Sequence, residues 1–147
     1  MAINPIPDGF HTITPYMAVK NAAEFIDFLS KGLNAVVLDV MKGNDGAVMH
    51  ANVKIGDSMV MVAEAPPERA LVASMLYLYV PDTDVLYHRV VAAGGISLME
   101  PADQFYGDRN AGVQDRWGNQ WWIATHVKDV TSEEMQQGMN ERERNRA

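Results

Sequence analysis

A pattern that occurs twice in this chain of 147 residues constrains its fold more than any other feature. Residues 21–35 and 81–96 both have apolar side chains at helical spacing and predict two equivalent helices, the first of which opens with Asn21 as its expected cap. Each helix follows a strand-like run that ends in valine, at Val19 and Val80, and these residues are 80 − 19 = 61 positions apart. Similarity at a fixed offset indicates a duplicated unit.

The remainder of each half consists of short, β-branched or alternating runs separated by Gly and Asp turns, which predict strands. Each half therefore has the order strand, helix, strand, strand, strand. We predict an α+β fold of tandem βαβββ modules, with the first module in residues 1–66 and the second in 67–130. Residues 131–147 are polar and predict an exposed helix that frays after Gly138, or a segment that is ordered only against a partner subunit.

Composition and charge exclude several classes of protein. The net charge is −7 and basic residues cluster only at the extreme C-terminus, so we expect no binding to nucleic acid or to an anionic membrane. No apolar run approaches the roughly 20 residues that span a bilayer. The start of the chain lacks a secretory-signal pattern, which leads us to expect a cytoplasmic protein. There is no cysteine, so disulfide and thiol chemistry are excluded.

Three segments carry a resemblance to a known family. GFHTITPYMAV (9–19), DQFYGDRNAGVQDRWGNQWWIATHV (103–127) and DVTSEE (129–134) resemble the PhnB-like branch of the vicinal oxygen chelate superfamily, which includes glyoxalase I, bleomycin-resistance proteins and extradiol dioxygenases. The resemblance covers about residues 8–134. It implies two four-stranded sheets that form a curved eight-stranded cup, the glyoxalase/bleomycin-resistance fold, with helices outside and ligands bound inside.

The resemblance also implies where a metal would be bound. Metal-dependent members take one His or Glu from the first and last strand of each half. The matching positions are Thr14, Met61, Met75 and Trp122, and they follow the repeat, since 75 − 14 = 61 and 122 − 61 = 61. None of the four has the imidazole or carboxylate group that a divalent ion requires here. We therefore expect no metal and no cofactor.

Alternation along the strands predicts which side chains face the cup, because successive residues of a strand point to opposite faces. The residues assigned to the cup are Thr14, Tyr16, His50, Asn52, Met59, Met61, Met75, Tyr77 and Trp122. Methionine and aromatic side chains suit a small planar or amphipathic ligand. The same residues could instead fill the cup by packing against one another, and the sequence leaves both interpretations open.

Three polar residues, one of them already assigned to the cup, are candidates for specific roles in the site. His50 has the ionisable group with the best position for a general base or a hydrogen-bonding anchor, or it is a partly exposed strand residue. Tyr106 and Arg109 belong to a loop motif in which Arg109 either pairs with Asp108 or Asp115, or binds a ligand carboxylate or phosphate. Pro15 cannot donate a hydrogen bond, so its strand is expected at a sheet edge or to be bulged.

Together these observations predict a metal-free, PhnB-like protein that works as a homodimer and binds a small planar organic molecule in its cup. One alternative is a lyase, isomerase or dioxygenase-like enzyme with a metal at a displaced site that includes His50. Another is a scaffold whose dimer interface is its function.

Overall fold

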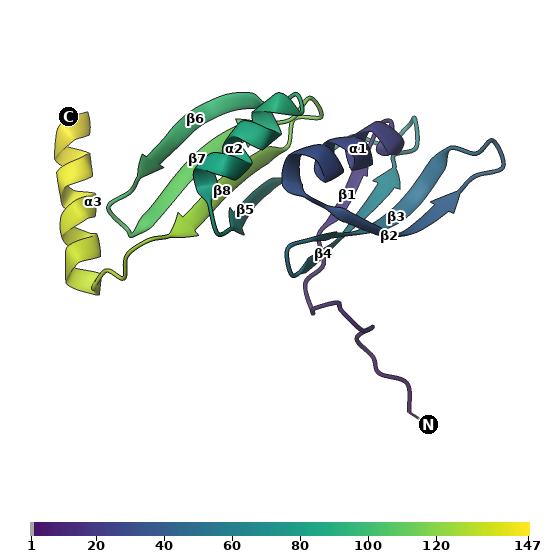
Figure 1. The fold of residues 1–147 in the computed structure, drawn as a ribbon, viewed down its shortest axis with the longest axis horizontal. Helices are drawn as coiled ribbons and strands as arrows, with labels where there is room; N and C mark the ends of the chain where they lie inside the picture. The colour runs from purple at the N-terminus through teal and green to yellow at the C-terminus, as the bar shows by residue number, and fades with distance from the viewer. Residues whose placement is uncertain (1) are drawn as a thin grey trace.

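The computed structural model describes residues 2–147 and contains two modules followed by a helix (Figure 1). The first module consists of β1 (Tyr16–Val19), α1 (Ala22–Leu33), β2 (Val36–Lys42), β3 (Val48–Ile55) and β4 (Ser58–Glu64). The second consists of β5 (Met75–Tyr79), α2 (Thr83–Ala92), β6 (Ile96–Asp103), β7 (Asp108–Gln114) and β8 (Gln120–His126). The C-terminal helix α3 (Ser132–Arg146) completes the chain. No helix of residues 2–147 is long and apolar enough to cross a membrane.

The two sheets have the same topology. Their strand orders are β1-β4-β3-β2 and β5-β8-β7-β6, and in each the first strand pairs in parallel with the last. Tyr16 lies opposite Met61 in the first sheet, and Tyr77 lies opposite Trp122 in the second. Both positions differ by 61 residues between the modules, which confirms the repeat and the α+β fold class. Pro15 directly precedes the edge strand β1, as expected for a residue without a backbone donor.

One face of each sheet is covered by its helix. Met17 and Val62 from the first sheet and Val113 and Ile123 from the second are buried in a common core. The helices α1 and α2 also pack against each other, and a Cβ on Gly32 would lie only 3.4 Å from the Cβ of Ala93. The core therefore runs continuously beneath both helices and joins the modules.

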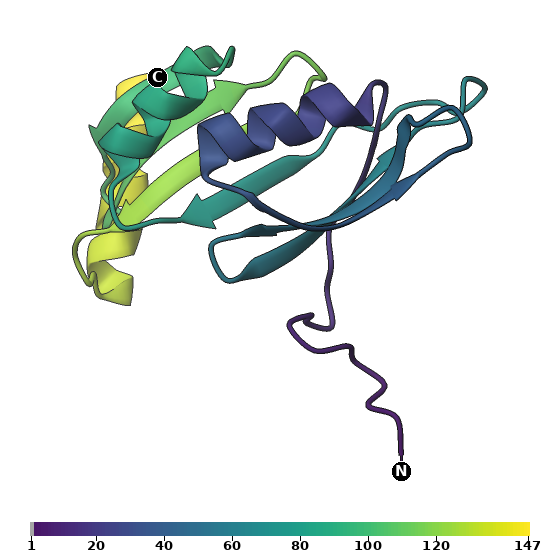
Figure 2. The same ribbon diagram turned by 45° about the vertical axis from the view of Figure 1, so that its right-hand side comes forward.

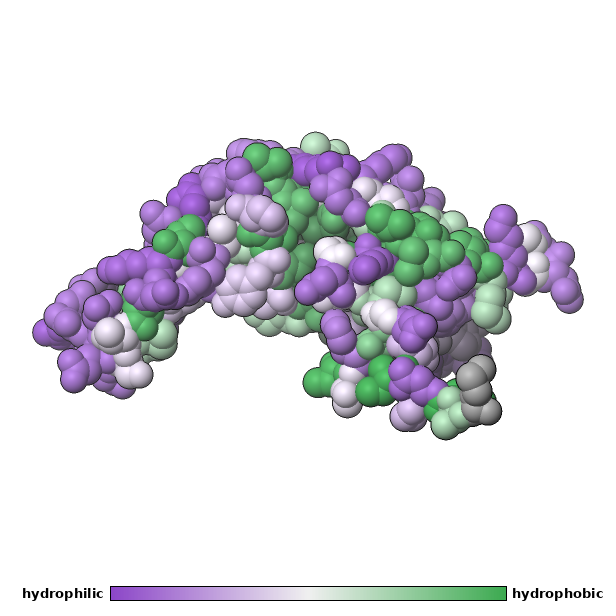
Figure 3. Space-filling view, turned by 60° about the horizontal axis from the view of Figure 1, so that its bottom comes forward, coloured by the Kyte–Doolittle hydropathy of each residue, from purple (hydrophilic) through white to green (hydrophobic). Residues whose placement is uncertain are grey.

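The modules lie side by side, and their sheets do not close over each other within one chain (Figures 1 and 2). Between residues 2 and 147, the strands of one sheet do not pair with the strands of the other. The packing of α1 on α2 accounts for this arrangement, because it brings the helical sides together and leaves the opposite sides uncovered. Figure 3 shows the underside as a hollowed arch with hydrophobic residues in its middle and α3 as a hydrophilic arm. We call the uncovered surfaces the open faces of the sheets.

Two local features differ from the sequence-based expectation. Asn21 precedes α1 but its side chain does not cap the helix, because the carboxylate of Glu64 accepts the amides of Asn21 (3.1 Å) and Ala22 (3.0 Å) instead. The helix α3 does not fray after Gly138 but continues to Arg146. Gly138 packs closely against Phe105, and Thr131 caps the start of the helix by accepting the amide of Glu134 (3.1 Å).

Candidate ligand-binding site on the open faces

The open face of the first sheet holds four of the predicted site residues. Tyr16, His50, Asn52 and Met61 lie on β1, β3 and β4. The rings of Tyr16 and His50 are 5.8 Å apart and tilted, and Asn52 donates a long hydrogen bond to Asp39 (3.4 Å). On this face the thioether of Met61 therefore lies between the amide of Asn52 and the ring of Tyr16, with the imidazole of His50 nearby.

The two other predicted residues of the first module have different surroundings. Met59 is buried, with an exposed fraction of 6%. Thr14 lies before β1, and its hydroxyl donates to the carbonyl of His11 (3.3 Å). A ligand on the middle of this face would thus meet Met61 rather than Met59.

The open face of the second sheet holds Met75, Tyr77 and Trp122 from the predicted set. Met75 and Tyr77 have exposed fractions of 67% and 46%, and Tyr79 follows on the same face of β5 with 66%. Large apolar and aromatic side chains with this much exposure are unusual on a surface that nothing covers. The second open face is therefore the more exposed aromatic surface of the two.

Trp122 lies flat on this face. Gly112 is its partner on the neighbouring strand β7, and a Cβ at Gly112 would lie 2.7–2.9 Å from three carbons of the indole ring. Only a residue without a side chain leaves room for the ring against the sheet. The indole Nε1 donates to Oε1 of Gln120 (3.1 Å), which holds the ring in its plane. One side of the indole rests on the strand, so the other side is presented away from the sheet.

A buried carboxylate organises the polar end of the same face. Asp108, which is 4% exposed, accepts hydrogen bonds from the hydroxyls of Tyr77 (2.8 Å) and Tyr79 (3.0 Å). Its other oxygen lies 3.1 Å from Nδ1 of His126, whose Nε2 lies 2.7 Å from Asp129. The tyrosine side chains reach from β5 to β7 over the intervening strand β8, where Ala124 is small and fully buried.

The ionisation of this cluster follows from its contacts. Burial acts to raise the pKa of Asp108, but hydrogen bonds from Tyr77, His126 and Tyr79 outweigh it and hold the pKa below the ordinary value. Asp129 and then Asp108 raise the pKa of the His126 imidazole. Burial, together with Asp108, raises the pKa of the Tyr77 phenol, so this group stays protonated at neutral pH.

Asn110 connects the cluster to Tyr106 in the turn between β6 and β7. Its amide nitrogen donates to the hydroxyl oxygens of Tyr77 (3.1 Å) and Tyr106 (2.6 Å). The amide oxygens of Asn110 and Asn52, one on each open face, are buried and accept no hydrogen bond from residues 2–147.

Arg109 lies away from the open face. Its guanidinium makes a two-pronged ion pair with Asp84 on α2 (2.6 and 2.8 Å) and a further bond to Asp103 (3.2 Å). These partners replace the expected Asp108 and Asp115. Asp108 is the neighbour of Arg109 on β7 and points to the opposite face. Asp115 lies beyond the other end of the strand, where it accepts hydrogen bonds from Asn119 and Trp121. Arg109 thus joins the second sheet to its helix.

Four residues of the cluster were not among the predicted site residues, namely Tyr79, Asp108, Asn110 and His126. The signal that could have found them was the alternation itself. His126 and Trp122 share one parity on β8, and Tyr79 and Tyr77 share one on β5. The pairing of β5 with β8 brings these two sets together, and the pairing of Asp108 with His126 adds the residues of β7.

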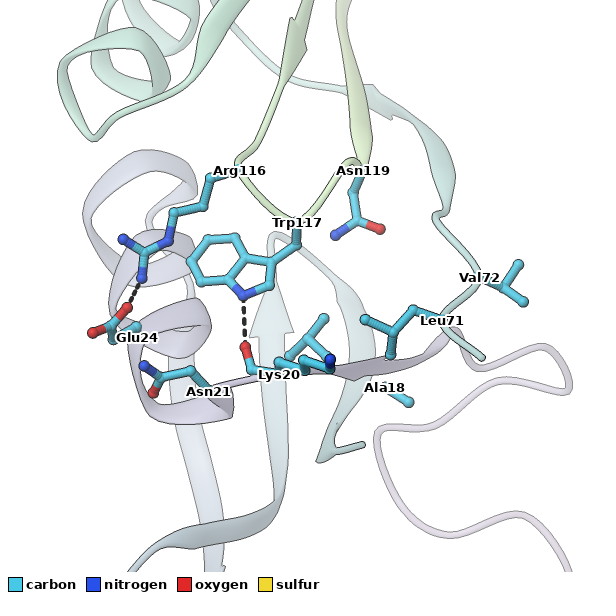
Figure 4. A pocket seen from close by; sticks show the side chains of 10 residues that line it. Ala18, Lys20, Asn21, Glu24, Leu71, Val72, Arg116, Trp117 and Asn119 are labelled. Atoms are coloured by element: carbon cyan, nitrogen blue, oxygen red, sulfur yellow. Dashed lines mark hydrogen bonds and ion pairs between the residues drawn. The ribbon is translucent and has the colours of Figure 1, made fainter. Parts of the chain in front are cut away.

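A cavity of about 390 Å³ lies at the junction of the modules (Figure 4). Trp117 donates its indole N–H to the carbonyl of Lys20 (2.7 Å), and Arg116 stacks over the Trp117 ring while pairing with Glu24. Trp117 and Arg116 of the second module thus have their polar partners in the first module. We therefore assign these contacts to holding the modules together.

Comparisons with known proteins agree with this architecture. The model of the glyoxalase/bleomycin resistance protein/dioxygenase superfamily matches residues 9–123. The chain belongs to this superfamily. An uncharacterised protein of Mycobacterium bovis is 32% identical over 151 residues, which cover 95% of this chain and 97% of that protein.

Solved structures with lower sequence identity have the same fold. TioX from Micromonospora sp. ML1 is 22% identical with a TM-score of 0.70, and the match covers 80% of this chain and 99% of TioX. A PhnB protein from Bacillus cereus, described as a putative 3-demethylubiquinone-9 3-methyltransferase, is 15% identical with a TM-score of 0.60, over 78% of this chain and 99% of that one. These similarities show the shared fold.

The metal site of metal-dependent superfamily members does not fit this chain. At the matching positions, Thr14 is bonded to a backbone carbonyl, Met61 and Met75 are thioethers, and Trp122 lies over Gly112. No group of three or more His, Cys, Asp or Glu residues within residues 2–147 is arranged to hold a metal ion. These four positions therefore offer no ligands for a metal-dependent step.

Proposed function

We propose that this superfamily member binds a small planar organic molecule on the open face of its second sheet, with no metal at the superfamily's usual position. The observation that carries the proposal is the indole of Trp122, which rests on Gly112 and presents its other side as a stacking surface. Aromatic stacking contributes roughly 0.5–1.5 kcal/mol beyond the burial of area. Met75 and Tyr77 border this surface and offer further apolar contact.

The proposal includes a homodimer in which a second copy covers the open faces. The edge strand β2 is exposed along all seven of its residues. Five of them are large and apolar, namely Val36, Val37, Leu38, Val40 and Met41. An exposed, apolar edge strand normally has a partner, because it otherwise promotes aggregation. The partner would then supply His50 of its own first sheet as a polar contact for the ligand.

The PhnB-like branch and a cytoplasmic location belong to the same proposal. The motifs at residues 9–19 and 103–127 support the branch. They include Gly112 and Trp122, which form the stacking surface, so the motif and the site coincide.

Calorimetric titration with 2-ethylnaphthalene, a planar probe without polar groups, tests the stacking surface. We expect Trp122→Ala to weaken binding about tenfold or more, because stacking and apolar burial are both lost. Trp117→Ala is the matched control, since it removes an indole from the module junction. Circular dichroism must show that both variants remain folded. Equal affinity of the wild type and Trp122→Ala would refute the proposal.

A further inference from the structure

The hydroxyl and amide donors of the polar cluster on the second open face can be matched with their acceptors one by one. The Tyr77 and Tyr79 protons go to Asp108, and the two amide protons of Asn110 go to the oxygens of Tyr77 and Tyr106. The hydroxyl of Tyr106 accepts from Asn110, but within residues 2–147 it donates to no acceptor. It is the one hydroxyl of this cluster whose proton is free for a ligand.

The Tyr106 hydroxyl lies beside the stacking surface. Its partner Asn110 and the glycine beneath the indole, Gly112, are two residues apart on β7 and point to the same face. Two residues of an antiparallel strand span about 7 Å, which is close to the length of a fused bicyclic ring. A flat molecule stacked on Trp122 can therefore extend an attached group toward Tyr106.

The charges around Tyr106 determine which kind of ligand group can bind to its hydroxyl. The carboxylate of Asp108 is connected to Tyr106 through Tyr77 and Asn110, and it would repel an anion. Each cation of the neighbourhood has an acidic partner, since Arg109 is paired with Asp84 on the other face, His126 lies between Asp108 and Asp129, and Lys128 has Glu134 at 4.0 Å. A neutral acceptor is thus favoured over a carboxylate or phosphate. The bond that Tyr106 accepts from Asn110 polarises its hydroxyl and strengthens its donation.

We propose that the ligand of this site is a planar aromatic molecule with a neutral carbonyl group, which accepts a hydrogen bond from Tyr106 while the ring stacks on Trp122. This inference rests on the proposed function, and it adds the chemical class of the ligand and the residue that selects it. Tyr106 acts by binding, and no reaction is assigned to it.

The test uses three naphthalene probes that differ only in the group at position 2: acetyl (neutral carbonyl), ethyl (no acceptor) and carboxylate (anion). Calorimetry with the full chain should show that the acetyl probe binds about three- to tenfold more tightly than the ethyl probe, the range expected for one net hydrogen bond. The carboxylate probe should bind more weakly than the acetyl probe. In Tyr106→Phe, the acetyl and ethyl probes should bind equally.

Tyr87→Phe is the matched control, because it removes the same hydroxyl from the helix side of the second module, where Tyr87 donates to Ser97 (2.7 Å). This variant should keep the preference for the acetyl probe. Equal binding of acetyl and ethyl probes to the wild type, or a preference that survives in Tyr106→Phe, overturns the carbonyl inference and leaves the stacking proposal intact. If no probe binds, or if Trp122→Ala binds all three unchanged, the stacking proposal itself fails.

Discussion

Glu64 and Thr125, which are 61 residues apart, cap the helices of their respective modules in the same way. Glu64 accepts the amide of Ala22 (3.0 Å) from the end of β4, and Thr125 accepts the equivalent amide of Thr83 (3.0 Å) from β8. A carboxylate and a hydroxyl thus perform one task at matched positions. Because both the acceptors and the amides are related by the repeat offset, the two modules also match in the hydrogen bonds made at the starts of their helices.

These two caps should stabilise the protein independently. We expect Glu64→Ala and Thr125→Val each to lower the free energy of unfolding by about 1–2 kcal/mol, since orphan helix amides lose their acceptors. The double variant should be additive within about 0.5 kcal/mol, because the sites lie in separate modules. Urea denaturation measures the effect, and Glu68→Ala in the exposed linker is the control for loss of charge. A double variant no less stable than one single variant would contradict this expectation.

Protonation of His126 should stabilise the fold below neutral pH. Its folded-state pKa is raised by Asp129 and Asp108, so its contribution is complete below the ordinary imidazole pKa of about 6.5 and is lost as the pH rises through the folded value. The difference in urea midpoint between the wild type and His126→Gln should therefore be larger at pH 5.5 than at pH 9. Because the other histidines are common to both proteins, their titration cancels. A difference that grows with pH would reverse the assigned sign.

Gly138→Ala should not stabilise α3, although alanine is the better helix former by about 1 kcal/mol. The added Cβ would overlap Cδ2 of Phe105 and lie 2.7 Å from Cγ and 2.9 Å from Cβ of the same residue, so α3 must move away from the turn that precedes β7. Amide hydrogen exchange in α3 should become faster in this variant. Gln137→Ala, on an exposed position of the same helix, serves as the control. Slower exchange in Gly138→Ala would contradict this expectation and show that the Phe105 ring moves aside without displacing α3.

The protein should sediment as a dimer. At micromolar concentration we expect about twice the chain mass of 16.3 kDa, because a second copy would cover the apolar edge strand β2 and the open faces. Val40→Lys and Met41→Lys together should shift the equilibrium toward the monomer. A wild-type protein that remains a monomer at this concentration would refute the homodimer.

Natively purified protein should contain no stoichiometric Zn²⁺, Ni²⁺, Mn²⁺ or Fe²⁺. The residues at the superfamily's ligand positions lack the donors that these ions require, and Trp122 occupies its position with a ring held against Gly112. Elemental analysis decides the point, with a chelator-treated sample as the reference. One equivalent of metal per chain, whose removal lowers stability, would support the displaced site around His50 instead.

The sequence predicted those features that depend on local periodicity. Alternation of side chains placed Tyr77 and Trp122 on one face of the second sheet, and the two-residue period of a strand needs no knowledge of the rest of the fold. The helix starts and the repeat offset also followed from local patterns. The fold class could therefore be predicted almost completely.

Features that depend on distant pairing could not be predicted in this way. Asp108 draws its partners from β5 and β8, and only the strand order brings them together. Arg109 has nearby acidic residues in the sequence, yet it pairs with Asp84 on α2 because of the side of the strand on which it lies. Glu64 replaces Asn21 as the cap of α1 from 43 residues away. The candidate site thus required the three-dimensional arrangement.

The three tryptophans of the chain give it built-in optical reporters of three different regions. Trp121 is buried and bonded to Asp115 (2.9 Å), Trp122 lies on the open face, and Trp117 reaches Lys20 across the module junction. The first module has no tryptophan of its own. Tryptophan fluorescence therefore reports on the second module and on the module junction, while unfolding of the first module alone is visible only through Trp117. Comparing emission with circular dichroism during unfolding would reveal whether the halves separate before they melt.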